Sequence, residues 1–112
     1  MEQFHAVTKY IRISPRKARL AANLIRGLPV SEARLQLAYC ELKAGTLLLK
    51  TLNSAIANAE SQSDSREERL VVKEVRVDEG PRLKRAKPRS KGSQHPILKR
   101  TSHFVVVVGS AE

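Results

Sequence analysis

The strongest constraint on this chain of 112 residues is the segment at residues 80–103, GPRLKRAKPRSKGSQHPILKRTSH. It contains eight Lys or Arg residues and neither Asp nor Glu. The runs that flank it, residues 70–77 and 103–109, are rich in β-branched residues and are typical of strands. A cationic segment with so little apolar content cannot build a core of its own, so it requires a partner outside the chain.

The connection between these two strands is about 25 residues, far longer than the loop of an ordinary hairpin. One interpretation is a disordered loop, which is common for charged stretches that contain Gly and Ser. The other is an extended arm in which the strands continue outward for roughly 30 Å. Spaced apolar residues and a predicted tight turn at residues 89–92 favour the arm.

The net charge of +10 is concentrated toward the two ends of the chain. Residues 3–31 hold six basic and no acidic residues (+6), and residues 80–111 hold eight and none (+8). Residues 32–79 hold seven basic and nine acidic residues (−2). Ordinary soluble surfaces mix both signs, so this segregation predicts a face that binds a polyanion.

Length and composition predict one domain over residues 1–112, within which residues 80–103 form the basic arm. Cys40 is the only cysteine, which fits a reducing compartment. No stretch approaches the roughly 20 apolar residues of a membrane span. The start MEQFHAV also lacks the pattern of a secretion signal. We expect a cytoplasmic protein.

The apolar pattern predicts an α+β fold, with three helices packed on a small antiparallel three-stranded sheet and a long extended β-hairpin. A first strand is predicted near residues 4–13, and helices over about residues 15–27, 31–42 and 44–61. The run FVVVV (104–108) would promote aggregation on an open edge, so we expect an inner strand there.

Each predicted helix has a start signal or an apolar stripe. Ser14 is the predicted cap of the first helix and Ser31 that of the second, and Gly27 is predicted to end the first. The first stripe consists of Ala18, Ala21, Ala22 and Ile25, widened by Leu20 and Leu24. The second consists of Ala33, Leu37 and Ala38, and the third of Leu48, Leu52, Ile56 and Ala59.

The opposite side of the first helix carries Arg16, Arg19, Asn23 and Arg26. A solvated face is the simpler interpretation. However, Arg16 and Lys17 lie in the first turn, where the helix dipole disfavours cations. A phosphate bound at this end would make the two cations favourable, because they and the free helix amides would all contact it. We favour this interpretation.

Among anionic partners, RNA fits this chain best. Membrane-binding segments usually come with an amphipathic helix or a lipid anchor, and neither is evident. A DNA reader would be expected to show a turn-helix partner for its recognition helix. Folded RNA is recognised by shape and phosphate position, which suits an irregular arm.

The sequence offers little support for an enzyme. His5, His95 and His103 are scattered, and a metal site built from them with Cys40 is improbable. No Gly-rich phosphate motif or metal-binding helix signature is present. We predict no catalysis, no cofactor, no metal and no small-molecule substrate.

Five collinear stretches resemble bacterial large-subunit ribosomal protein twenty-two, a family whose long hairpin enters the polypeptide exit tunnel. They are SPRKARLAANLIRG (14–27), SAIANAE (54–60), VDEGP (77–81), the KR…PR-K-G pattern (84–92) and ILKRTSH (97–103). The pair VDEGP and LKRTSH is the most specific, and the stretches span nearly the whole chain.

The resemblance implies a structural, non-enzymatic constituent of the large ribosomal subunit that binds and organises large-subunit (23S) ribosomal RNA during assembly. The globular part would lie near the polypeptide exit site, and the hairpin would line the tunnel. Implied partners are this RNA, neighbouring ribosomal proteins including protein four at the tunnel constriction, and the nascent polypeptide. A free-standing DNA-binding or regulatory protein remains the alternative.

The candidate RNA-binding residues fall into two groups. Those of the globular part are Lys9, Arg12, Ser14, Arg16, Lys17, Arg19 and Arg26. Those of the arm are Arg82, Lys84, Arg85, Lys87, Arg89, Lys91, Lys99, Arg100 and His103. By resemblance, Arg89, Ser90, Lys91 and Gly92 form the tunnel-facing tip, and Leu83, Lys84 and Arg85 match the segment that affects macrolide susceptibility.

The chain departs from the family pattern at residues 93–96, SQHP, where many members carry more Arg. Pro96 lacks an N–H group, so regular hairpin pairing is not expected there.

Overall fold

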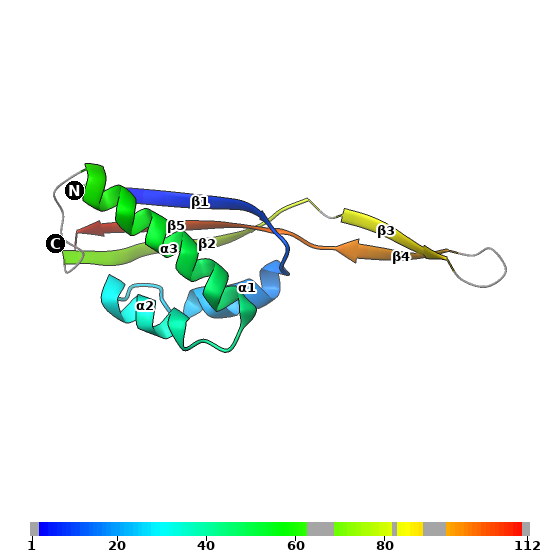
Figure 1. The fold of residues 1–112 in the computed structure, drawn as a ribbon, viewed down its shortest axis with the longest axis horizontal. Coiled ribbons are helices and arrows are strands. Elements are labelled where there is room, and N and C mark those ends of the chain that lie inside the picture. Colours follow the sequence, from blue (N-terminus) through cyan, green and yellow to red (C-terminus); the bar gives the residue numbers. More distant parts are fainter. Residues whose placement is uncertain (1–2, 63–68, 82, 89–93, 111–112) are drawn as a thin grey trace.

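The computed structural model describes residues 3–62, 69–81, 83–88 and 94–110 (Figure 1). Within these residues the chain forms three helices and five strands. They are, in order, β1 (Gln3–Ile11), α1 (Pro15–Asn23), α2 (Val30–Ala38), α3 (Lys43–Gln62), β2 (Leu70–Glu79), β3 (Leu83–Pro88), β4 (Gln94–Lys99) and β5 (Ser102–Ser110).

Three of the strands form an antiparallel sheet in the order β1-β5-β2. The central strand β5 pairs Val108 with Phe4 of β1 and Phe104 with Val77 of β2. The run FVVVV thus lies in the inner strand, as predicted. The α+β fold class is confirmed by this sheet and the three helices.

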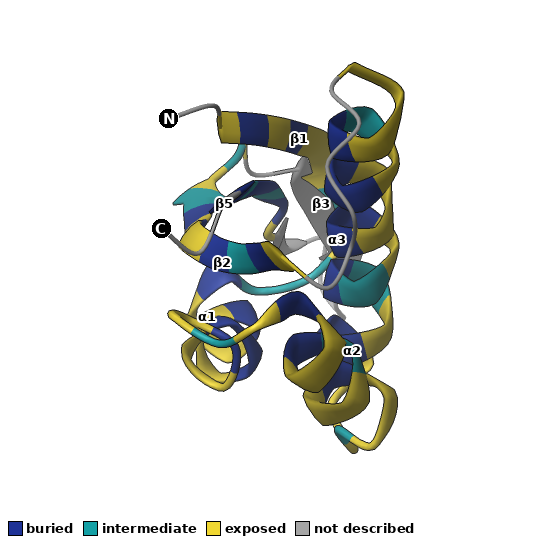
Figure 2. Cartoon of the chain, turned by 90° about the vertical axis from the view of Figure 1, so that its left-hand side faces the viewer, coloured by how far each residue is buried: buried dark blue, intermediate teal, exposed yellow. Residues whose placement is uncertain are grey.

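The core lies between one face of this sheet and the helices. Buried side chains alternate in the first half of β1 and along most of β2, whereas β5 is buried along most of its length. Helix α3 lies along β1 and β5, while α1 lies along β2 (Figures 1 and 2). The largest fully buried members are Phe104, Ile25, Leu37, Leu48, Leu52, Ile56 and Leu70. Figure 2 shows the buried stripes of the helices turned toward the strands. We call this unit, formed by β1, β2, β5 and the three helices, the body.

Helix α1 starts at Pro15 as predicted, but it ends at Asn23, before Gly27, whose φ is 82°. Ser14 occupies the N-cap position without a capping hydrogen bond from its side chain. The prediction that Leu20 and Leu24 are buried is wrong, because they are 58% and 44% exposed. The buried stripe is narrow because its alanines let α1 lie close to its neighbours, which leaves the leucines on the flank.

The prediction that Ser31 caps helix α2 is wrong. The N-cap position is occupied by Pro29, so Ser31 lies inside the helix and is exposed. The helix ends at Ala38, which is also exposed, although Ala33 and Leu37 are buried as predicted. The segment before the helix pairs with β2, with Val72 N–H donating to the Leu28 carbonyl at 2.9 Å. This pairing holds Pro29 in an extended conformation, so the helix starts directly after it.

Helix α3 follows its prediction within one residue at each end, and the predicted stripe of Leu48, Leu52, Ile56 and Ala59 is buried. Its buried Thr51 hydroxyl lies 2.8 Å from the Thr8 hydroxyl of β1. This hydrogen bond satisfies a polar group at the helix–sheet interface.

Strands β3 and β4 form a separate two-stranded antiparallel ribbon, which we call the arm (Figure 1). It projects from one end of the body, and the molecule measures 64 × 25 × 16 Å along its principal axes. The predicted extended arm is therefore observed. The predicted tip at residues 89–92, like Arg82, lies outside the described residues.

The ladder of the arm continues through Pro96, which is paired with Ala86. The expectation of irregular pairing there is wrong. In a two-stranded ribbon, alternate N–H groups point away from the partner strand, so a proline at such a position removes no ladder hydrogen bond.

Candidate nucleic-acid interface

The arm is connected to the body at a junction formed by Gly80 and Pro81, which follow β2, and by Arg100, Thr101 and Ser102, which lead into β5. Gly80 N–H donates to the Thr101 carbonyl at 2.9 Å, and the Thr101 hydroxyl donates to the Pro81 carbonyl at 2.6 Å. The Ser102 hydroxyl donates to the carbonyl of Ile13 at 2.7 Å. Since the Thr101 and Ser102 side chains are buried, these bonds close the root of the arm.

Gly80 is needed at this junction for its lack of a side chain. A Cβ at this position would collide with the Thr101 hydroxyl oxygen and come within 3.1 Å of the His103 ring. The backbone of β2 can therefore approach β5 closely where the arm begins.

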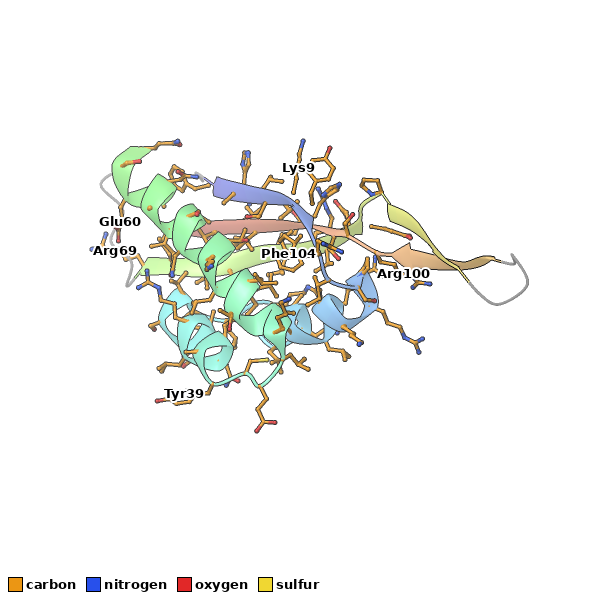
Figure 3. The ribbon with its side chains drawn as sticks, turned by 45° about the vertical axis from the view of Figure 1, so that its right-hand side comes forward. Lys9, Tyr39, Glu60, Arg69, Arg100 and Phe104 are labelled. Atoms are coloured by element: carbon orange, nitrogen blue, oxygen red, sulfur yellow. The ribbon has the colours of Figure 1, made fainter. Side chains whose placement is uncertain are left out.

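Several predicted cations gather at the end of the body from which the arm extends. Lys9, Arg12, Arg16 and Lys17 are exposed near the end of β1 and the start of α1 (Figure 1). The exposed Arg100 lies at the root of the arm, on the same end as Lys9 (Figure 3). The first turn of α1 contains no acidic residue. We call this group of five side chains the cationic end.

The opposite end of the body is mixed in charge. Glu60 and Arg69 lie there, far from the arm (Figure 3). The cationic end is thus adjacent to the arm, and the acidic residues Asp78 and Glu79 of β2 also lie near the root of the arm.

Two of the predicted RNA-binding arginines make contacts within the body. The Arg19 guanidinium donates to the Val77 carbonyl at 3.2 and 3.1 Å, and Arg26 donates to the Val75 carbonyl at 2.9 Å. Arg26 also donates to Asn23 at 2.7 Å. Both carbonyls belong to β2, an edge strand of the sheet.

These contacts protect the sheet edge. Farther along β2, Val72 exchanges backbone hydrogen bonds with Gly27 and Leu28. The segment from α1 to α2 thus supplies partners along the outer edge of β2, which would otherwise invite pairing with another chain. Sequence reasoning missed this role, because Arg19 and Val77 are 58 residues apart.

A contact that the sequence did not predict lies at the junction. Tyr10 has a φ of 60°, at an irregularity of β1 between Thr8 and Ile11. Its N–H donates to His103 Nδ1 at 3.1 Å, and the two rings meet edge to face with centroids 5.0 Å apart. His103, a predicted RNA-binding residue, therefore also supports the conformation of Tyr10.

For the arm, the structure defines the backbone register of the predicted residues. It pairs Leu83 with Lys99, Lys84 with Leu98, Arg85 with Ile97 and Lys87 with His95. Arg89 and Lys91 lie with Arg82 outside the described residues.

The described residues contain no group of three His, Cys, Asp or Glu side chains that could hold a metal ion. Over the same part of the chain, no helix is long and apolar enough to cross a membrane. The feature that remains as a candidate site is the cationic end together with the arm.

Comparison with known proteins identifies the family. The family described as "Ribosomal protein L22p/L17e" matches residues 6–109. Large ribosomal subunit protein uL22 of Protochlamydia amoebophila is 66% identical over 110 residues, covering 98% of this chain and 99% of that protein. The proteins of the same name from Chlamydia abortus and Chlamydia pneumoniae are each 57% identical over 109 residues, covering 97% of this chain and 98% of theirs. The chain therefore belongs to the L22p/L17e family of ribosomal proteins.

Proposed function

We propose that this protein binds and organises large-subunit ribosomal RNA through its arm and its cationic end. The observation that carries the proposal is the arm itself. It is a ribbon of two six-residue strands that projects from a well-packed body. Such a ribbon is marginally stable in water, so RNA packed around it would supply the missing contacts.

The coarser part of this function follows from the family. Membership of a family of structural ribosomal proteins confirms the predictions of a non-enzymatic protein of the large ribosomal subunit that takes part in translation. Its location is accordingly the ribosome, in the cytoplasm.

The finer placement is part of the proposal. We infer that the arm lines the polypeptide exit tunnel, close to ribosomal protein four and the nascent polypeptide, with the body near the exit site. The residues at 83–85, LKR, would then lie on the arm where they can affect macrolide susceptibility. The extended shape of the arm supports this placement, since a tunnel wall requires a narrow element that reaches far from its anchor.

The charges of the described residues support RNA as the ligand. The cationic end lies where the arm leaves the body, and phosphates can be contacted there by Lys9, Arg12, Arg16, Lys17 and Arg100. Contacts of this kind release counterions, so binding should weaken as the salt concentration rises.

Sedimentation of cell extracts separates this proposal from a free-standing DNA-binding or regulatory protein. We expect the protein to travel with large subunits and to remain there at moderate salt. Recovery mainly in the soluble pool or on chromosomal DNA would support the alternative. A variant lacking residues 81–100 serves as the control, and it should lose the association if the arm is the anchor.

A further inference from the structure

Tyr10 is held in a conformation that its own backbone disfavours. Its φ of 60° lies in the left-handed region, where residues with large side chains are rare. The residue is nevertheless 64% exposed, so burial does not explain the conformation. Strain of this kind at an exposed residue often marks a functional position.

The support around Tyr10 fixes its ring in place. The N–H of Tyr10 is bonded to His103 Nδ1, and the His103 ring meets the tyrosine ring at an interplanar angle of 89°. Behind His103 lies Gly80, whose missing side chain makes room for the imidazole. The tyrosine ring is thus anchored to β5 and to the root of the arm.

Basic residues lie next to Tyr10 in the chain and at the same end of the molecule. Lys9 and Arg12 flank Tyr10 along the chain, and Arg100 lies at the same end of the molecule (Figure 3).

Acidic residues are also near: Asp78 pairs with His103 in the ladder and Glu79 follows it on β2. The Asp78 carboxylate is bonded to Arg76 at 3.1 Å, and Arg76 also bonds Glu74 at 3.4 Å.

We propose that Tyr10 is a stacking platform for an unpaired nucleobase of the bound RNA. A fixed, exposed aromatic ring with basic residues next to it is a combination with which proteins hold unpaired bases. The proposal rests on the RNA-binding function proposed above and adds a contact of a different kind, because stacking is independent of phosphate charge.

Fluorescence provides a direct test, since the chain contains no tryptophan. Tyr10→Trp and Tyr39→Trp each introduce one indole, and Tyr39 is the matched control because it is 83% exposed outside the cationic end. On titration with deproteinised large-subunit ribosomal RNA, we expect strong quenching for Tyr10→Trp and little change for Tyr39→Trp.

Affinity measurements provide a second test. Tyr10→Asn removes the ring and suits a positive φ, so it should weaken RNA binding on the order of tenfold without lowering the thermal unfolding midpoint. The loss should be the same at every salt concentration, because no charge is removed. Tyr10→Phe should bind within about twofold of the parent, as stacking needs the ring and not the hydroxyl.

The outcomes distinguish this proposal from the function on which it rests. In one outcome, ribosomal RNA binds with a strong salt dependence while the fluorescence of Tyr10→Trp is unchanged and Tyr10→Asn binds with the parent's affinity. That result would refute the stacking role of Tyr10 and leave the RNA-binding function intact. A drop in unfolding midpoint that accounts for the lost affinity of Tyr10→Asn would assign the ring a structural role only. Absence of RNA binding by the parent protein overturns both proposals.

Discussion

In the body, strand β5 lies between β1 and β2 and beneath the helices, whereas in the arm strand β4 is paired with β3 alone within the described residues. The two strands are separated only by Arg100 and Thr101. The body has a hydrophobic core in which Phe104, Val106 and Val108 are buried. Among the residues that the structure describes, the arm has strand pairing without a covering layer. Strand pairing thus gives the arm its extended course, whereas hydrophobic packing stabilises only the body.

Hydrogen exchange on the free protein measures this contrast directly. Amides of β5 should open with a free energy close to that of global unfolding, and those of β3 and β4 with a free energy near zero. Exchange rates corrected for sequence should therefore differ by a factor of about 1,000 or more. Strong protection throughout the arm in the absence of RNA would contradict the contrast.

Charge removal should affect RNA binding and leave the body stable. Replacing Lys84, Arg85 and Lys87 by Ala should reduce affinity for large-subunit ribosomal RNA on the order of 100-fold. It should also lower the slope of log affinity against log salt by up to about 3. The triple replacement of Lys50, Arg69 and Lys73 by Ala is the matched control, because these exposed residues lie on the body and outside the cationic end. Unchanged assembly and unchanged macrolide response for the arm variant would count against our placement of the arm.

The junction should connect the two regions energetically. Gly80→Ala forces Thr101 away from β2, so we expect a loss of about 2 kcal/mol in the free energy of unfolding, measured with urea. Thr101→Ala removes the colliding hydroxyl. The double variant should consequently lose less than the sum of the two single losses. Simple additivity would mean that this close contact carries no energetic coupling.

The arginines of α1 and of the turn that follows it should divide into two classes, and this is the smallest effect that we expect. Arg26→Ala removes a hydrogen bond to the β2 edge and should cost about 1 kcal/mol in unfolding free energy. Arg16→Ala, in the exposed first turn, should change stability by less than about 0.5 kcal/mol. Instead, Arg16→Ala should reduce the salt slope of RNA binding by about 1. Equal behaviour of the two variants in both assays would remove the distinction.

Much of the fold could be predicted from local pattern. The β-branched run at residues 104–108 indicated an inner strand, and the spacing of Leu48, Leu52 and Ile56 indicated the buried face of α3. These predictions succeeded because strand and helix periodicity reflect burial directly. The charge segregation likewise indicated the arm and the cationic end.

The failures share a physical cause, which is dependence on distant parts of the chain. Leu20 and Leu24 fit a helical stripe, but the close approach permitted by the alanines of α1 leaves them exposed. Ser31 looked like a cap, yet pairing of the preceding segment with β2 moved the helix start to Val30. The strain at Tyr10 depends on His103, which is 93 residues away, and no local pattern encodes it.

The pairing of β2 with β5 continues to Glu79 and Ser102, directly at the root of the arm. The body therefore holds the outgoing and returning chain about 4.8 Å apart whether or not the arm is ordered. To the body, the arm is an insertion in a hairpin loop, and doubling the length of such a loop costs only about 0.6 kcal/mol in closure entropy. The arm can thus be lengthened or shortened, by evolution or by engineering, without changing the packing of the body.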